Sequence, residues 1–184
     1  MISERVRLRE AVVSLPAKLL RALAIAVTLV AAGFSESCYT LNGISISPET
    51  QTFYVTQFDV TTTEGPPGIG QLFTEQLKRR INDDTRLAFA DTDPDVEFVG
   101  AITGFTITPE APNPQTGADL NRLTIRVQVD YTDTRTPENS YSQSFTDFEN
   151  FDGAVDPLSV QDQLVEVLFD RLSEEAFNKA FSNW

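Results

Sequence analysis

The groups available for chemistry are carboxylates, guanidinium groups, amines and hydroxyls, because the 184-residue chain has no histidine and one cysteine, Cys38. Ser-His and Cys-His catalysis, and zinc sites built on those ligands, are therefore excluded. Carboxylates concentrate at Asp83, Asp84 and in residues 91–95, where they could ligate calcium or form an acid–base pair. The run lacks the glycine and distal glutamate of an EF-hand loop, so we expect a solvated acidic turn. We predict no metal, no cofactor and no enzymatic activity.

Five basic residues could hold an anionic ligand. Lys78, Arg79 and Arg80 form a run near the end of an expected helix, where cations also interact favourably with the helix dipole. Arg122 and Arg126 belong to an alternating segment, and from its polar face they could reach a phosphate or a carboxylate. The alternative for this pair is cross-strand pairing with the abundant Asp and Glu residues. We keep all five as candidate ligand-binding residues.

Three phenylalanines, Phe145, Phe148 and Phe151, follow one another at spacings of three. They could belong to the core or present an apolar patch to a partner protein. We favour the core, because large apolar side chains are more often buried than exposed. Phe148 and Phe151 nevertheless lie off the alternation of the strand that precedes them.

Cys38 follows an apolar run, residues 22–34, which is itself preceded by five basic residues. The run is shorter than the roughly 18 residues that cross a bilayer, and its flanks are those of a bacterial lipoprotein export signal. We expect residues 1–37 to be removed and Cys38 to become the lipidated first residue, although residues 35–37 depart from the usual cleavage motif. The alternative is a secretory signal followed by a free thiol, which could form no internal disulfide.

Residues 38–184 are enough for a single domain with a substantial core. They carry nine Lys and Arg against 24 Asp and Glu, which gives a formal charge of −15. Such a charge repels nucleic acid and gives no general attraction to anionic lipid headgroups. Because no second apolar run is long enough to span a bilayer, we expect membrane attachment to depend on Cys38.

The period of the apolar residues sets the expected elements. Residues 123–131 alternate almost perfectly between apolar and polar, which predicts a strand with one buried face. In an earlier strand the apolar positions switch from even to odd around Gly104, which predicts a bulge. We expect strands at 52–60, 96–108, 123–132 and 140–148, a short extended piece at 87–90, and helices at 69–81 and from 157 to the C-terminus.

This order of elements predicts an α+β fold in which two helices pack on one face of a mainly antiparallel sheet of four to five strands. We divide the chain into a signal peptide at 1–37 and one domain at 38–184. Residues 109–117, with three prolines, are expected to form a loop.

Several short segments carry a family resemblance. They are Cys38-Tyr39, residues 42–46, 71–77, 85–87 and 121–125, Ser144-Phe145 and residues 176–184. Each is weak alone, but in this order behind a cysteine they are similar to LptE, the lipopolysaccharide-assembly outer-membrane lipoprotein, in its Bacteroidetes-type form. The similar segments span residues 38–184.

The resemblance implies a lipid-anchored protein at the periplasmic face of the outer membrane that sits as a plug in the lumen of the LptD β-barrel. It would help assemble that barrel and deliver lipopolysaccharide to the cell surface. The family is also reported to contact lipopolysaccharide through basic residues, which we do not match to positions here. For a protein that plugs a barrel, the candidate anchors of the partner interface are Phe148, Phe151 and Trp184, since such anchors are often aromatic.

Two other functions remain open from the sequence. A periplasmic or surface lipoprotein could bind a carbohydrate or a peptide on the exposed strand face and the loop at 109–117. An enzyme would need an acidic pair in a cleft, for which residues 91–95 offer the densest carboxylates. Stable association with a large β-barrel would separate the plug from both.

Overall fold

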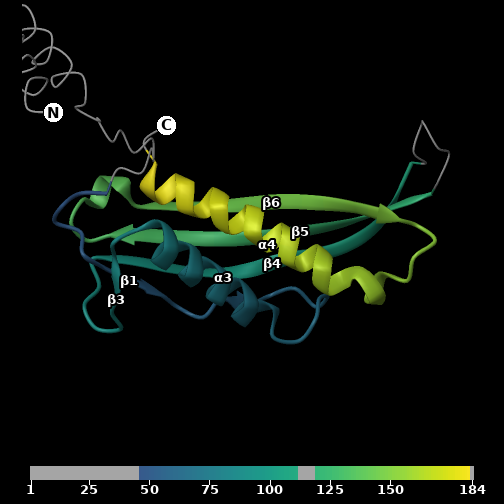
Figure 1. Ribbon diagram of the computed structural model, residues 1–184, viewed down its shortest axis with the longest axis horizontal. Coiled ribbons are helices and arrows are strands. Elements are labelled where there is room, and N and C mark those ends of the chain that lie inside the picture. The colour runs from purple at the N-terminus through teal and green to yellow at the C-terminus, as the bar shows by residue number, and fades with distance from the viewer. Residues whose placement is uncertain (1–45, 112–118, 183–184) are drawn as a thin grey trace, which may run out of the picture. The chain divides into compact units, whose positions relative to one another are not determined.

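The computed structural model describes residues 46–111 and 119–182, all of which lie in the unit formed by residues 43–184 (Figure 1). Cys38, Trp184 and most of the loop at 109–117 lie outside the described residues. Two helices and a mixed, mostly antiparallel sheet make up this unit, so the predicted α+β fold is confirmed.

The sheet has six strands in the order β3-β1-β4-β5-β6, with β2 beside β4. Three long strands, β4, β5 and β6, are antiparallel, whereas the three short strands pair in parallel. The number of strands exceeds the predicted four to five, because β2 and β3 have only two residues each and such short strands leave no pattern in the sequence. The strands are β1 Thr52–Val55, β2 Asp59–Val60, β3 Ala88–Phe89, β4 Val96–Glu110, β5 Leu120–Asp133 and β6 Tyr141–Asp152.

The central strand β5 turns every odd-numbered side chain from Leu123 to Tyr131 into the core. Its even-numbered side chains face away, as the predicted alternation requires. In β4 the pairing with β5 shifts between Ile102 and Gly104, so the predicted bulge is confirmed. The shift keeps Phe98 and Phe105 on one face although one is even-numbered and the other odd.

The strand predicted at 52–60 is two strands, because the chain turns inward at Phe58. The Phe58 ring is 1% exposed, and its N–H donates a 2.9 Å hydrogen bond to Thr74 Oγ1 on the first helix. The Thr56 N–H still donates to the Phe98 carbonyl oxygen of β4 at 2.9 Å and Gln57 is exposed, so it is Phe58 that packs under that helix. In the opposite direction, β4 runs through Pro109 to Glu110, two residues into the predicted loop.

Helices α3, Ile69–Asp84, and α4, Pro157–Phe181, cover the same face of the sheet (Figure 1). Asp156 caps α4 by accepting from the Leu158 N–H at 3.1 Å, as the predicted Asp-Pro start allows. Phe73 of α3 lies edge to face against Phe58 and Phe169, with ring centroids 4.9 and 5.1 Å away. Such contacts add about 0.5–1.5 kcal/mol each beyond burial, and they join the two helices to each other and to the segment between β1 and β2.

We predict that Gly70→Ala destabilises the protein, although glycine to alanine inside a helix ordinarily adds about 1 kcal/mol of stability. A Cβ at Gly70 would lie 2.2 Å from the Phe58 carbonyl oxygen, so α3 would have to move off the core. We expect a loss of about 1–3 kcal/mol in the free energy of unfolding, measured with urea. Gln71→Ala, at the exposed next position, is the control, and a more stable Gly70→Ala protein would contradict this packing.

Candidate binding site

The face of the sheet opposite the helices is left uncovered by the described elements, and we call it the outer face. The even-numbered side chains of β5 and β6 project from it. Phe148 is 47% exposed there, whereas Phe145 and Phe151 are buried among the core residues on the other face. The core preference therefore holds for two of the three phenylalanines. Phe148 departs from it because β6 continues to Asp152 without a bulge, which keeps position 148 on the outer face.

Arg122 and Phe148 contact each other on the outer face. The guanidinium carbon of Arg122 lies 4.1 Å from the Phe148 ring centroid. Its Nε donates to Asn150 Oδ1 at 3.0 Å, and its Nη1 lies 3.3 Å from Glu110 Oε1. A cation over an exposed ring contributes about 0.5–1 kcal/mol. Arg122 is thus cross-strand paired, and it holds the exposed aromatic ring in place.

Arg126 lies four residues further along β5 on the same face. Its Nε donates to Thr146 Oγ1 at 3.3 Å, and no ion pair among the described residues includes it. Four strand residues span about 13 Å, so Arg126 and Arg122 can contact two separated groups of one ligand. The described part of the chain leaves Arg126 as an exposed cation on this surface.

The basic run of α3 does not converge on a site. Lys78 Nζ lies 3.6 Å from Glu75 Oε1 and 5.1 Å from the Phe89 ring centroid. Arg79 donates to Gln76 Oε1 at 3.1 Å. Both side chains are engaged on the surface of their own helix and its neighbouring strand.

Arg80 ties the two helices together. Its Nη2 lies 2.6 Å from Asp170 Oδ1, and its Nε donates to Ser173 Oγ at 3.2 Å. The second carboxylate near it is Asp84, at 3.8 Å. The structure therefore places the α3 basic run on the helical layer and the β5 arginines on the outer face, so the five candidates do not form one site.

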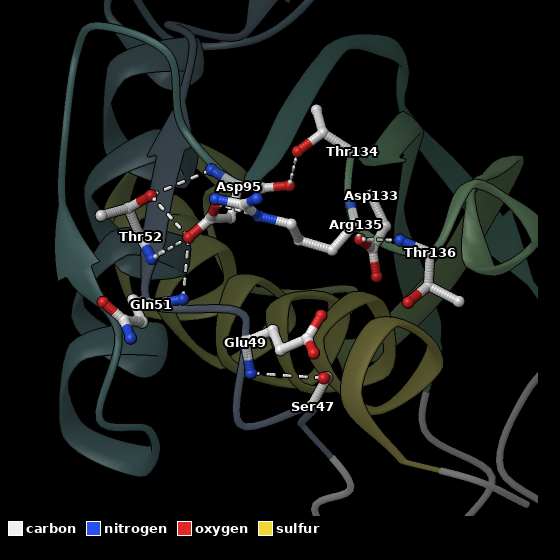
Figure 2. A network of polar contacts seen from close by, with 9 residues as sticks. All are labelled: Ser47, Glu49, Gln51, Thr52, Asp95, Asp133, Thr134, Arg135 and Thr136. Atoms are coloured by element: carbon white, nitrogen blue, oxygen red, sulfur yellow. Dashed lines mark hydrogen bonds and ion pairs between the residues drawn. The ribbon is translucent and has the colours of Figure 1, made fainter.

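The acidic run at 91–95 contains a structural carboxylate (Figure 2). Asp95 is 6% exposed, and its Oδ2 accepts from the backbone N–H groups of Gln51 and Thr52 at 2.8 and 3.0 Å. Its Oδ1 accepts from Arg135 Nε at 2.6 Å. Within the described ranges no three acidic or thiol side chains are placed to hold a metal ion. Asp95 instead joins the start of β1 to the turn that follows β5.

Hydrogen bonds to the ionised form hold the pKa of Asp95 at about 2, below the ordinary 3.8. The Gln51 N–H is the largest cause; burial opposes it, and Arg135 and Thr52 add to the lowering. Sequence reasoning missed this role because the partners of Asp95 lie 40 to 44 residues away along the chain. No local pattern marks such a site.

A groove of about 430 Å³ lies between α3 and α4. Leu72, Val165 and Phe169 line it, together with Pro66 and Pro67. Leu72 is 55% exposed, and the rest of the lining is polar or charged: Glu75, Gln76, Arg79, Asp162 and Glu166.

A family model described as LptE, lipopolysaccharide-assembly, matches residues 50–181, which include every strand and helix given above. No curated protein matches the sequence. In the part of the chain that the structure describes, none of the helices is both long enough and apolar enough to cross a membrane.

Solved structures with a similar chain path come from several bacteria. A hypothetical protein from Chlamydia trachomatis has a TM-score of 0.49 at 11% identity, over 71% of this chain and 98% of that one. A protein from Xanthomonas campestris has a TM-score of 0.48 at 11% identity, over 73% and 87%. A minor lipoprotein from Acinetobacter baumannii has a TM-score of 0.47 at 10% identity, over 71% and 91%.

We predict that Asp95→Asn lowers the free energy of unfolding at pH 7 by about 1–2 kcal/mol, the scale of a charged hydrogen bond partly screened by solvent. Because the pKa of Asp95 falls on folding from 3.8 to about 2, its contribution is complete above about pH 4 and is lost as the pH falls toward 2. Asp95→Asn should therefore flatten the acid limb of a stability profile measured with urea.

The control for this experiment is Asp91→Asn, an exposed carboxylate of the same turn. It should leave both the stability at pH 7 and the acid limb unchanged. Equal acid dependence in the wild type and Asp95→Asn would refute the role given to Asp95.

Proposed function

The chain belongs to the LptE family of lipopolysaccharide-assembly proteins, and we propose that it is an outer-membrane lipoprotein that plugs an LptD-type β-barrel and helps assemble it. The observation that carries the proposal is the extent of the family match, which runs from two residues before β1 to the last residue of α4. The whole α+β domain is thus the unit that the family shares. Delivery of lipopolysaccharide to the cell surface would follow from the barrel's assembly.

A contact role suits the chemistry of the outer face. Phe148 presents a half-exposed ring beside Arg122, and aromatic and arginine side chains are the commonest anchors of protein interfaces. We propose Phe148 as an anchor against the barrel. Phe151, at 8% exposure, would support that surface from the core, and Trp184 would add a second aromatic at the end of the chain.

Direct binding of lipopolysaccharide would have to rely on cations such as Arg126, because Arg122 is already paired with Glu110. Residues 38–184 carry a formal charge of −15, which opposes a polyanionic ligand. We therefore assign the assembly role to protein contact. The exposed Arg126 and Phe148 favour one second function, a lipoprotein that binds a carbohydrate or a peptide on the outer face.

We predict that Cys38→Ala releases the protein from the outer membrane. Two or more acyl chains hold a protein to a bilayer stably, and Cys38 is the only residue of the chain that can carry a lipoprotein anchor. Fractionation should find the variant in the periplasm, and mass spectrometry of the wild type should find lipid on Cys38. Lys78→Ser is the control and should stay in the outer-membrane fraction. A wild-type protein without lipid on Cys38 would refute the anchor.

We predict that the tagged full-length protein, extracted from outer membranes in detergent, brings down an LptD-type barrel in near-equal amount. Phe148→Ala should lower that recovery about tenfold, which is the loss expected for an interface anchor. Val99→Ala, on a 39% exposed valine of the same face, should not lower it. Recovery of the lipoprotein alone would refute the barrel partnership and favour the ligand-binding alternative.

A further inference from the structure

The groove of about 430 Å³ lies on the helical layer, between two helices that cover the same face of the sheet (Figure 1). On each helix its lining residues follow the first at spacings of three, four and seven, beginning at Leu72 on α3 and at Asp162 on α4. This spacing forms one stripe along a helix surface. Each stripe is roughly seven residues or about 10 Å long, which is two helical turns.

Contacts beneath and beside the groove fix the two helices. The buried rings of Phe73 and Phe169 meet edge to face, with their centroids 5.1 Å apart. Asp170 of α4 accepts from Gln76 Nε2 at 3.2 Å and lies 2.6 Å from Arg80 Nη2. Because these contacts already hold α3 and α4 together, the groove is formed before anything binds to it, which lowers the cost of binding.

The shape of the groove fits a third helix. Two neighbouring helical stripes form a concave surface, and the side-chain ridge of a further helix packs into such a groove. Leu72 is 55% exposed at the rim, whereas Val165 and Phe169 are 4 and 3% exposed at the floor. Apolar side chains of an added helix would remove Leu72 from water, which favours binding.

The charges of the lining favour a basic occupant. It contains three carboxylates, Glu75, Asp162 and Glu166, and one cation, Arg79. Among the ion pairs of the described residues, none includes Asp162, Glu166 or Arg79.

Asp162 and Glu166 repel each other, because they lie four residues apart on one face of α4. The helix dipole does not account for them, since its effect fades within the first turn and both residues lie beyond it. A lysine or arginine placed between these two carboxylates would relieve the repulsion, whereas an anionic ligand such as a fatty acid would add to it.

We propose that the groove between α3 and α4 binds a basic amphipathic helix of a second protein. Apolar residues of that helix, spaced three and four apart, would cover Leu72, and a lysine or arginine beside them would pair with Asp162 and Glu166. This site lies on the helical layer, whereas Phe148 lies on the outer face. It therefore goes beyond the proposed barrel contact and can be tested without the barrel.

The probe is a fluorescent peptide of about 15 residues, long enough to form a helix, in which leucines spaced three and four apart are flanked by lysines. A second peptide carries glutamate in place of every lysine. Fluorescence anisotropy measures the binding of each peptide to the tagged full-length protein in phosphatidylcholine nanodiscs, with empty nanodiscs as the blank. The wild type should bind the lysine peptide at least about tenfold more tightly than the glutamate peptide.

Two double variants separate the groove from the negative charge of the whole chain. Asp162→Asn with Glu166→Gln should weaken binding of the lysine peptide about three- to tenfold at low salt, and the difference should vanish at high salt. Asp83→Asn with Glu174→Gln removes the same number of charges from exposed positions outside the groove, and it should bind the peptide as the wild type does.

Leu72→Ala tests the apolar contact. It should weaken binding of the lysine peptide about five- to tenfold, because alanine offers less apolar surface for the peptide to cover. Val167→Ala is the matched control, since Val167 is 39% exposed on α4 and lies outside the lining. All of these variants should unfold at the wild-type temperature, because every changed side chain is exposed.

Charge reversal gives a second readout. Asp162→Lys with Glu166→Lys should bind the glutamate peptide about tenfold more tightly than the wild type does, and should bind the lysine peptide more weakly. If the two carboxylates only stabilise the fold, the reversal would weaken both peptides alike and would overturn the site.

The remaining outcomes are equally decisive. Equal weakening by the two double variants, or binding that Leu72→Ala leaves unchanged, would mean that the peptide follows the overall charge and would overturn the proposal. A wild-type dimer in light scattering that Leu72→Ala makes monomeric would mean that a second copy fills the groove, and the proposal would be wrong. A loss confined to the groove variants supports it, whatever the barrel recovery is found to be.

Discussion

One-sided burial of the sheet is the constraint on which the rest of this structure depends. The alternation of β5 sends one row of side chains into the core, and its neighbours β4 and β6 must present their apolar residues to the same side. Helices α3 and α4 fill that side, and the Phe58, Phe73 and Phe169 contacts fix them there. The groups that remain exposed to other molecules therefore lie on the outer face, at the sheet edges and on the helix surfaces.

This arrangement explains why few charged side chains are free to act in catalysis, whereas several surfaces are free to contact another molecule. The best hydrogen-bonded carboxylate, Asp95, is held ionised by backbone N–H groups and Arg135, and its bonds connect distant segments. Arg80 does the same between the helices. Charged groups used in this way stabilise the fold, and they leave Phe148 and Arg126 exposed on the outer face.

The sequence predicted correctly those features that depend on the residue pattern within a single helix or strand. The alternation at 123–131, the facing switch at Gly104 and the helical stripes of α3 and α4 each follow from local periodicity, and each is found in the structure. The short parallel strands were less visible, because two residues carry no period. The break at Phe58 depends on Thr74, which only the folded chain brings near.

The candidate site was only partly predictable for the same reason. Alternation places Arg126 on the wet face, but the contact of Arg122 with Phe148 depends on the register between β5 and β6. Asp95 with Arg135, and Phe148 with Arg171, join residues 40 and 23 positions apart. Such pairs have no signature in one sequence, since the partners lie far apart along the chain.

The central claim is that this LptE-family protein serves lipopolysaccharide assembly at the outer membrane. The most direct test is to deplete it in the bacterium that carries it and to measure lipopolysaccharide at the cell surface against the total. We predict that the surface fraction falls while the total is kept, because the proposed barrel partner would no longer be assembled. An unchanged surface fraction after complete depletion would contradict this account.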